Sequence, residues 1–257
     1  MEKIFGQSKA DHNPISEPDR ASFLVPARKD QPELLDQNLG SPADVRSNLT
    51  EMWRLNRYFG GISALTRHLY PLLHQSLEPI RVVDIGTGSG EMAALLVRWA
   101  AQQHLPIRIG ALDHSERNLS VARDNTQTTP GIFLVQADAC ALPFADHQVD
   151  YFISSLFLHH LSPQQVVDVL RETYHRARHG IVMSDLIRGY LPLLAFRIIQ
   201  PVFARNYLTY HDGLLSIRRA YTASELLSFA QAAGLETAHV YRHFPWRMTL
   251  VAEKPRV

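Results

Sequence analysis

Short apolar runs alternate with amphipathic runs along most of this chain, and that alternation constrains its fold more than any other feature. Strand-like runs are predicted at 80–85, 107–113, 131–138, 149–158 and 180–186. Apolar residues at helical spacing predict helices at 91–104, 115–125, 162–178 and 222–234. Strands that alternate with helices predict parallel βαβ units, and therefore a doubly wound α/β sheet.

Two further strands are predicted near the C-terminus, at 236–244 and 248–254. Only a few residues around Pro245 and Trp246 join them, which is too short for a parallel crossover, so we expect an antiparallel hairpin. The predicted fold is a mostly parallel, Rossmann-like sheet of seven strands that ends in this hairpin and is preceded by N-terminal helices.

The 257 residues suit one large α/β domain with helical additions. At 1–40 we expect a mobile tail, because its first part is polar, dotted with proline and without period; an ordered arm over the active site is the alternative. The domain itself is expected at 41–257. It should open with a helix capped by Ser41 and ended by the glycine pair 60–61.

The bulk composition excludes several classes of protein. A formal net charge of +1 and a pI near 8.0 give no field that would make nucleic acid the main partner. The single cysteine, Cys140, fits a reducing compartment, and the N-terminus lacks the apolar core of a secretory signal. The most apolar stretch, 190–204, is interrupted by polar residues and is too short to span a bilayer. We therefore expect a cytoplasmic protein.

The stretch GTGSG at 86–90 follows the first strand of the alternation. In an open α/β sheet the ligand binds beyond the carboxyl ends of the strands, where this turn should lie. The dinucleotide pattern GxGxxG would need a third glycine where this chain has Glu91, and a carboxylate at a helix N-terminus repels a pyrophosphate. A phosphate-binding P-loop would need a lysine that is absent here. The turn therefore predicts a ligand without a phosphate.

Acidic residues end three consecutive strands. Asp84 can face an amine, and Asp113 can accept both hydroxyls of a ribose. Asp138 and the backbone N–H of Ala139 match the donor and acceptor on an adenine edge. Together they favour a nucleoside that carries an amine, although a helix cap or a solvated strand end would explain any one of them alone.

Three stretches in this order resemble the motifs of class I S-adenosylmethionine-dependent methyltransferases: VVDIGTGSG, ALDHS and QADACALPFADHQVDYFISSLFLHHL. The last is similar to the ubiquinone/menaquinone-biosynthesis branch, whose members act on small molecules. The resemblance covers about residues 41–254. LNRYFGG and the segment that ends in YHDGLLSIRRAYTASEL resemble a bacterial subgroup of polyketide and phenolic-lipid pathways. The usual LKPGG before the fifth strand is here ARHG, which should change only that turn.

The resemblance implies S-adenosylmethionine as cofactor. Its methyl group would pass to a small apolar or phenolic, polyketide-like acceptor, on oxygen or carbon. In the family the glycines approach the methionine moiety, and the three acids hold the amino group, the ribose and the adenine in turn. The expected cofactor-binding residues are Asp84, Gly86, Thr87, Gly88, Gly90, Asp113, His114, Asp138, Ala139 and Ser155. A cyclase or decarboxylase that binds the cofactor without methylating, and a vestigial regulatory protein, are the alternatives.

Two adjacent histidines are the candidate catalytic residues. A phenol or enol must lose a proton, and histidine serves as a base near neutral pH. His159 and His160 follow the fourth strand, and at most one should face the pocket because neighbours on an extended chain point opposite ways. We favour His160; a packing role for both is the alternative. No HExxH or CxxC pattern indicates a metal.

Polar residues in the segment before the last predicted helix give weaker candidates. His211 and Asp212 form a second acid/base pair, although Asp212 followed by Gly213 is typical of a turn, which we favour. Arg218 and Arg219 could clamp a carboxylate, but a solvated face is the simpler interpretation.

The segment 189–220 is too long for an ordinary loop and too apolar to leave in water. We expect it to form a helical cap over an apolar acceptor, with Pro201 breaking its helix into two short halves. Arg197 and Arg205 would share one face of a straight helix and could rest on anionic lipid. A homodimer interface or plain core packing is the alternative.

Overall fold

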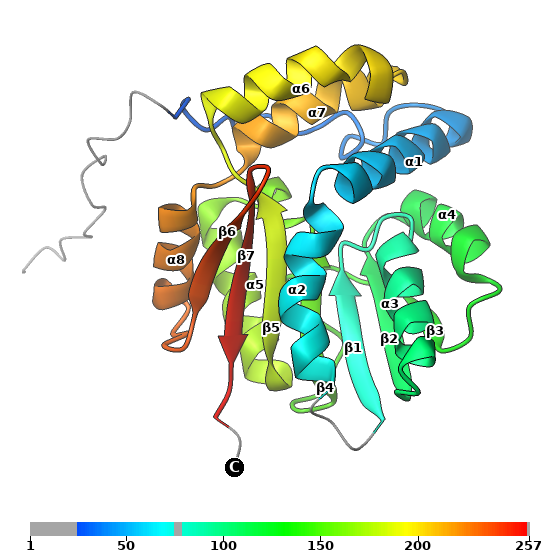
Figure 1. Ribbon diagram of the computed structural model, residues 1–257, viewed down its shortest axis with the longest axis vertical. Coiled ribbons are helices and arrows are strands. Elements are labelled where there is room, and N and C mark those ends of the chain that lie inside the picture. Colours follow the sequence, from blue (N-terminus) through cyan, green and yellow to red (C-terminus); the bar gives the residue numbers. More distant parts are fainter. Residues whose placement is uncertain (1–24, 75–78, 256–257) are drawn as a thin grey trace, which may run out of the picture.

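The computed structural model describes residues 25–74 and 79–255. Its strands form one sheet in the order β3-β2-β1-β4-β5-β7-β6 (Figure 1). They are β1 (Ile80–Ile85), β2 (Ile107–Asp113), β3 (Ile132–Gln136), β4 (Val149–Ser155), β5 (Ala177–Leu186), β6 (His239–His243) and β7 (Arg247–Glu253). The first five strands run parallel, and β7 lies antiparallel between β5 and β6. The predicted fold class and its terminal hairpin are confirmed.

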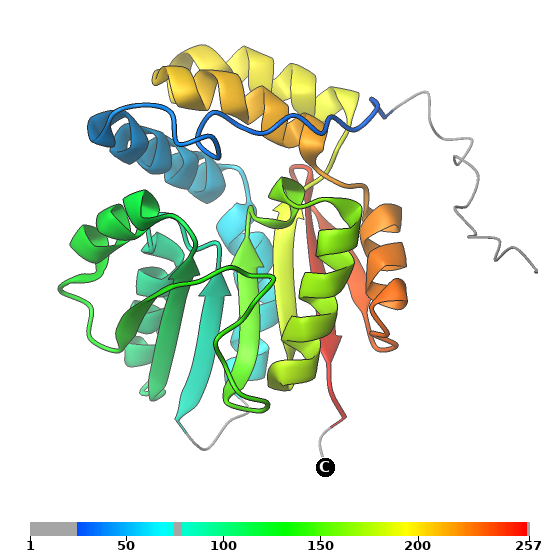
Figure 2. The same cartoon turned by 180° about the vertical axis from the view of Figure 1, so that it is seen from behind.

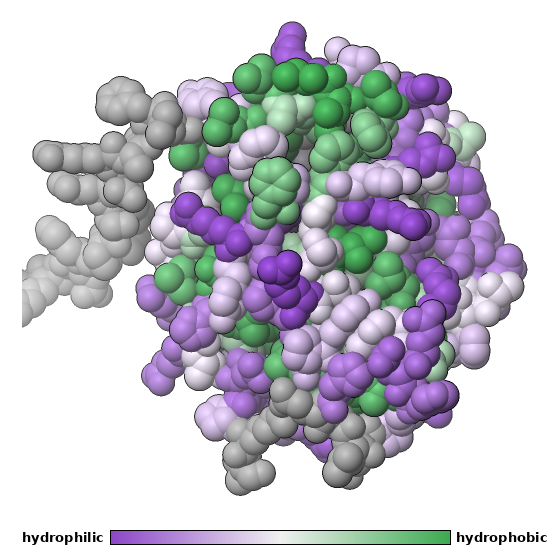
Figure 3. Space-filling model, in the orientation of Figure 1, coloured by the Kyte–Doolittle hydropathy of each residue, from purple (hydrophilic) through white to green (hydrophobic). Residues whose placement is uncertain are grey.

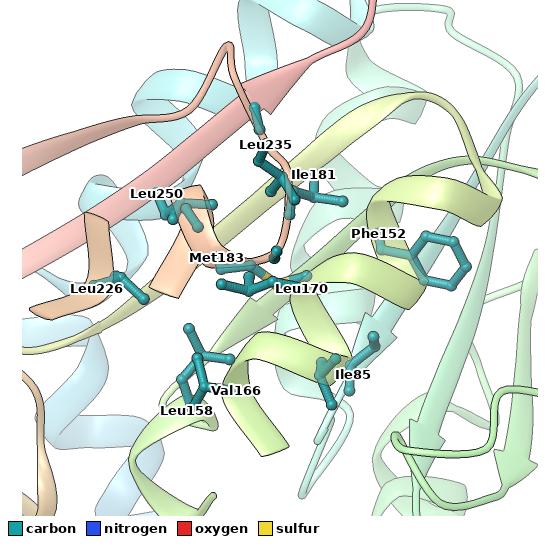
Figure 4. Close-up of a cluster of buried hydrophobic side chains, with 14 of the residues drawn as sticks. Ile85, Phe152, Leu158, Val166, Leu170, Ile181, Met183, Leu226, Leu235 and Leu250 are labelled. Atoms are coloured by element: carbon teal, nitrogen blue, oxygen red, sulfur yellow. The ribbon is translucent and has the colours of Figure 1, made fainter. Parts of the chain in front are cut away.

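Helices cover both faces of the sheet (Figures 1 and 2). The helices that cover the faces are α2 (Gly61–Leu73), α3 (Glu91–Gln102), α4 (Glu116–Thr126), α5 (Pro163–Arg176) and α8 (Ala223–Ala232), while α1 (Pro42–Tyr58) lies above the carboxyl ends of the strands. Successive side chains of a strand point to opposite faces, so Val82 packs with α2 and α3 while Val83 packs with α5 and α8. Figure 4 shows the second of these clusters, which brings Ile85 of β1 together with Leu170 of α5 and Leu226 of α8.

The predicted helix starts agree with the structure. Ser41, Ser162 and Thr222 each accept a hydrogen bond from the backbone three residues later and form a capping box. Three strands were predicted too long: 131–138, 149–158 and 236–244. The run 149–158 leaves the sheet after Ser155, because Leu156 adopts a left-handed backbone and a short 3-10 helix, η2 (Leu158–His160), follows.

The ARHG stretch, expected to change only a turn, forms the first residues of β5. The predicted helix 162–178 ends at Arg176, and β5 starts at Ala177 with no intervening loop. The strand is therefore longer than the predicted 180–186.

Residues 25–40 form an ordered arm, so for them the prediction of a mobile tail is wrong. Residues 1–24, the rest of that predicted tail, lie outside the described residues. The arm crosses the top of the molecule beside α1 and α7 (Figure 2). Glu33 is 3% exposed, and the backbone N–H groups of Leu34 and Leu35 donate to Asp212 of α7. A polar segment without period stays ordered here because α7 and η2 supply partners for its polar groups.

The segment 189–220 forms a cap of two helices, α6 (Tyr190–Phe203) and α7 (Tyr207–Arg219), above the carboxyl ends of the strands (Figure 1). Two expectations for it are wrong. Pro201 does not break α6 into two halves but lies in its last turn, two residues before the helix ends at Phe203. Asp212 and Gly213 lie inside α7, because Asp212 is held by the arm and Gly213 gives room to the ring of Phe196. Within the described ranges, no helix is both long and apolar enough to cross a bilayer.

Candidate functional site

A cavity of about 510 Å³ opens at the carboxyl ends of the central strands, under α1 and the arm. Of the ten residues expected to bind a cofactor, nine line it: Asp84, Gly86, Thr87, Gly88, Asp113, His114, Asp138, Ala139 and Ser155. Gly90 is not among the described lining residues. Its left-handed backbone instead starts α3, and a Cβ there would press on Thr126 and Ala122 of α4.

The glycine turn lets backbone approach the cavity closely. Gly86 adopts a φ of +67°, and a Cβ at this position would lie 2.5 Å from Cδ2 of Phe157. A side chain is therefore excluded by both conformation and contact. Next to it, Thr87 donates its hydroxyl to Asp84 at 2.7 Å.

Burial raises the pKa of Asp84 to about 7; the nearby Asp113 adds to the increase, and the Thr87 hydroxyl opposes it. Among the described residues, no cationic group counteracts the effect of burial on the Asp84 carboxyl. An ammonium group in the cavity would stabilise its charged form and lower the pKa again.

Asp113 holds the turn together. One carboxylate oxygen accepts the N–H of Gly88 at 2.9 Å, and the other accepts the N–H of Ser115 at 2.9 Å. Burial raises its pKa, and these backbone donors counteract the rise. The carboxylate still has acceptor capacity toward the cavity, because each oxygen can accept more than one hydrogen bond.

Asp138 caps its own loop, as its simpler interpretation predicted. Its Oδ1 accepts the N–H of Cys140 at 2.8 Å. The side chain is exposed at the cavity rim, while Ala139 is buried in the wall. A carboxylate has two oxygens, so the hydrogen bond to Cys140 leaves acceptor capacity at the cavity rim.

The sequence prediction missed the amide groups that α1 and α4 bring to this cavity. Asn48 and Asn118 line it, and their buried side-chain oxygens accept no hydrogen bond within the described chain. A buried acceptor without a donor is costly, so the cavity favours a ligand rich in N–H and O–H groups. No local pattern marks these two asparagines, because their common position depends on the tertiary fold.

The two candidate catalytic histidines lie in different surroundings. His159 is 1% exposed, is absent from the described cavity lining, and its Nδ1 lies 2.7 Å from Asp185 of β5. His160 lines the cavity and its Nδ1 lies 3.0 Å from Asp36 of the arm. Only one of the pair faces the cavity, as their adjacency in sequence suggested.

Charged groups of the arm raise the pKa of His160. Burial disfavours its charged form, but the carboxylates of Glu33 and Asp36 outweigh that effect and raise its pKa to about 9. His160 is therefore a cation at neutral pH. A general base needs a neutral imidazole, so the protonated His160 is poorly suited to that role.

Arg219 does not lie on a solvated face, so that interpretation of its sequence position is wrong. The guanidinium is buried and donates to the carbonyl oxygens of His159, His160 and Gln31, and to Asp36. It joins η2, α7 and the arm. Most of its partners are backbone carbonyl groups, which no residue type in the sequence identifies.

The two histidines and Glu33 are residue types that ligate metal ions. Glu33, His159 and His160 each place one ligand atom within 4.8 Å of the others. Arg219 lies beside the same groups and already supplies positive charge there. The sequence-based expectation of no metal remains a prediction.

The ion pair between His160 and Asp36 should make the stability depend on pH. A His pKa that folding raises from 6.5 to about 9 contributes about 3 kcal/mol below pH 6.5, and this contribution disappears as the pH rises through 9. We therefore expect the difference in unfolding free energy between wild type and His160→Gln, measured in urea, to shrink from pH 6 to pH 9.5. An equal difference at both pH values would contradict this assignment.

A second cavity, of about 410 Å³, lies beneath α6 and next to the first. Its wall is mostly apolar and includes Leu55, Phe59, Phe196, Ile199, Ile217 and Trp246. Two residues line both cavities, Met52 of α1 and Leu156 after β4. Leu156 has a φ of +60°, and such strained residues gather at functional sites.

Comparison with known proteins agrees with this geometry. Residues 82–180 match a family model described as a methyltransferase domain. The release factor glutamine methyltransferase of Mycobacterium tuberculosis is 42% identical over 77 residues, which are 29% of this chain and 25% of that protein. The demethylmenaquinone methyltransferase of Staphylococcus haemolyticus is 26% identical over 194 residues, 70% of this chain and 74% of that protein.

A solved structure of a SAM dependent methyltransferase from Aquifex aeolicus has the same fold, with a TM-score of 0.56 at 14% identity over 84% of this chain and 99% of that one. The chain spans about a quarter of the release factor enzyme. Residues 82–180 thus match a methyltransferase domain, a family whose methyl donor is S-adenosylmethionine, and the chain shares its fold with the Aquifex aeolicus structure.

Proposed function

We propose that this protein transfers the methyl group of S-adenosylmethionine to a small apolar acceptor bound under the cap. One observation carries the proposal: a polar cavity lined by acceptor groups and an apolar cavity share a boundary at Met52 and Leu156. A donor in the first cavity and an acceptor in the second would meet there. Alignment of this kind is the main requirement when the leaving group is already activated.

The residues of the first cavity fit the donor. Asp84 would pair with the ammonium group, Asp113 and Asn118 with the ribose hydroxyls, and Asp138 with Ala139 with the adenine edge. Gly86 brings bare backbone to the cavity wall, because a Cβ there would collide with Phe157. When bound, the sulfonium supplies an electrophilic methyl group, and the chain itself supplies position and exclusion of water.

The residues of the second cavity favour a small apolar acceptor. The second cavity can enclose a molecule of drug-like size, and aliphatic and aromatic groups dominate its wall. The Staphylococcus haemolyticus relative is a demethylmenaquinone methyltransferase, which supports a small-molecule acceptor here. A protein substrate, as for the release factor enzyme, is the alternative, and the fraction that carries the transferred label distinguishes the two.

Methyl transfer from isotope-labelled cofactor tests the proposal. Purified protein is incubated with cell extract and S-adenosylmethionine labelled in the methyl group, and the products are separated into organic-soluble and macromolecular fractions. We expect the label in one organic-soluble product identified by mass spectrometry. Label in protein or nucleic acid alone, or cofactor binding without any labelled product, would overturn the proposal.

The outer face of α6 is the surface by which an apolar acceptor would be collected from lipid. Leu191, Leu194, Ile198 and Val202 recur at helical spacing and are exposed, and hydrophobic side chains gather over the helices at the top of the molecule (Figure 3). Arg197 and Arg205 are exposed beside this stripe. Apolar insertion flanked by arginine is typical of binding to an anionic membrane surface.

Vesicle binding tests this surface. Cosedimentation with vesicles that contain anionic phosphatidylserine is expected, and the double substitution Leu194→Asp and Ile198→Asp should reduce the bound fraction at least tenfold. Neutral phosphatidylcholine vesicles are the control. A wild-type dimer that becomes a monomer in the variant, with no vesicle binding by either, would show a homodimer interface instead.

A further inference from the structure

One charged side chain enters the otherwise apolar second cavity. Arg247 begins β7 and pairs across the sheet with Leu186 of β5. It is 4% exposed, and it is the single charged group among the described residues that line this cavity. An arginine placed in an apolar wall needs a specific reason, because burial of a charge without a partner is costly.

The guanidinium is only partly paired. Its Nε donates to the carbonyl oxygen of Phe59 at 3.1 Å, which fixes the plane of the group. Its Nη1 is buried and finds no hydrogen-bond acceptor in the described residues. Buried donors in native proteins are nearly always hydrogen-bonded, so this Nη1 indicates a partner that the described residues do not supply.

The nearest acid does not supply that partner. Asp185 acts on Arg247 electrostatically, but its oxygens already accept the backbone N–H and Nδ1–H of His159 and the N–H of Leu186. No ion pair between Asp185 and Arg247 forms in the described part of the chain. Burial lowers the pKa of Arg247 to about 10, so the group still carries its charge at neutral pH.

We propose that Arg247 anchors the acceptor by pairing with an anionic oxygen group, a carboxylate or an ionised phenol or enol, on an otherwise apolar molecule. This rests on the proposed function in that it takes the second cavity as the acceptor site. The guanidinium lines this cavity with its Nη1 still without an acceptor, so it has donor capacity for such a group, and its plane matches a planar anion well. Arg247 is then a specificity-determining residue, and the apolar wall selects the rest of the molecule.

A matched pair of fluorescent probes tests the anchor without any knowledge of the acceptor. 1-Anilinonaphthalene-8-sulfonate carries an anionic group on an apolar body, and N-phenyl-1-naphthylamine has the same body without the charge. Both are titrated against the purified full chain, wild type and Arg247→Met. The matched control is Arg242→Met, which removes an exposed arginine from the neighbouring strand β6.

We expect Arg247→Met to weaken binding of the sulfonate at least tenfold and to change binding of the neutral probe less than twofold. Arg242→Met should change neither, and Arg247→Lys should recover part of the sulfonate affinity. The free Arg247→Met protein should melt within a few degrees of wild type, because the removed charge has no full partner.

Unchanged sulfonate binding in Arg247→Met, or equal loss of both probes with a lower melting temperature, would overturn the anchor and show a packing role. Failure of the proposed function gives a different result. In that case the wild type would transfer no label from the cofactor, whatever the two probes do.

Discussion

Replacing Asp113 by alanine is expected to weaken binding of S-adenosylmethionine by about tenfold to a hundredfold. The substitution removes the acceptor expected for the ribose hydroxyls, and it also leaves the N–H groups of Gly88 and Ser115 without their partner. Loss of such hydrogen bonds costs about 1–3 kcal/mol, and every 1.4 kcal/mol is about a factor of ten. Titration calorimetry of the cofactor and of S-adenosylhomocysteine measures the change.

Asp168→Ala is the matched control for Asp113→Ala, because it removes an exposed carboxylate from α5 that pairs only at the surface. Its affinity for the cofactor should equal that of wild type. Equal affinity in Asp113→Ala would show that this carboxylate only braces the glycine turn and does not bind the ribose.

Removal of the Asp185 carboxylate should have the largest effect on stability. Asp185 and His159 form a buried pair at 2.7 Å, and breaking such a pair typically costs about 3–5 kcal/mol. We expect Asp185→Ala to lower the unfolding free energy by that amount, measured in urea at pH 7. Asp168→Ala again serves as the control, with a change below about 0.5 kcal/mol.

The pH dependence of the Asp185 contribution has a definite sign. Burial alone would raise its pKa, but the charge and hydrogen bonds of His159 lower it below the ordinary value of 3.8. A lowered carboxyl pKa stabilises the fold above pH 3.8, and this stabilisation is lost as the pH falls through the folded-state value. The Asp185→Ala deficit should therefore persist at neutral pH and diminish in acid. A deficit that stays constant down to the acid transition would contradict this.

Each part of the site that could be predicted from sequence is recognisable within its own short segment. The glycine turn and the acids Asp84, Asp113 and Asp138 sit at strand ends, and parallel strands bring their carboxyl ends to one edge of the sheet. The strand and helix periods therefore fixed where these groups would meet. The capping boxes are local in the same sense.

The parts that could not be predicted depend on contacts across more than a hundred positions. The arm is held by Asp212, which is 177 positions from Leu35, and its own sequence has no period that would indicate order. Arg247 lies at the start of a hairpin strand, where an exposed arginine would be just as compatible with the pattern. Whether such a side chain is buried depends on which helix packs against it.

The cap shows a different reason for a wrong prediction. Proline and the Asp-Gly pair usually interrupt helices, and both occur here within helical segments. Pro201 lies in the last turn of α6, where helix termination follows within three residues. Gly213 is needed for the close contact with Phe196, and the carboxylate of Asp212 is needed for the arm. Tertiary contacts outweigh local propensity at these positions.

The shared boundary of the two cavities is the central claim, and Met52→Trp tests it most directly because a larger ring at this position should close the passage. Cofactor affinity by calorimetry and label transfer to the organic-soluble product are measured on the same preparation. We predict a dissociation constant within about twofold of wild type and transfer reduced at least tenfold. Unchanged transfer in a variant that binds the cofactor normally would show that the methyl group leaves the first cavity by another route.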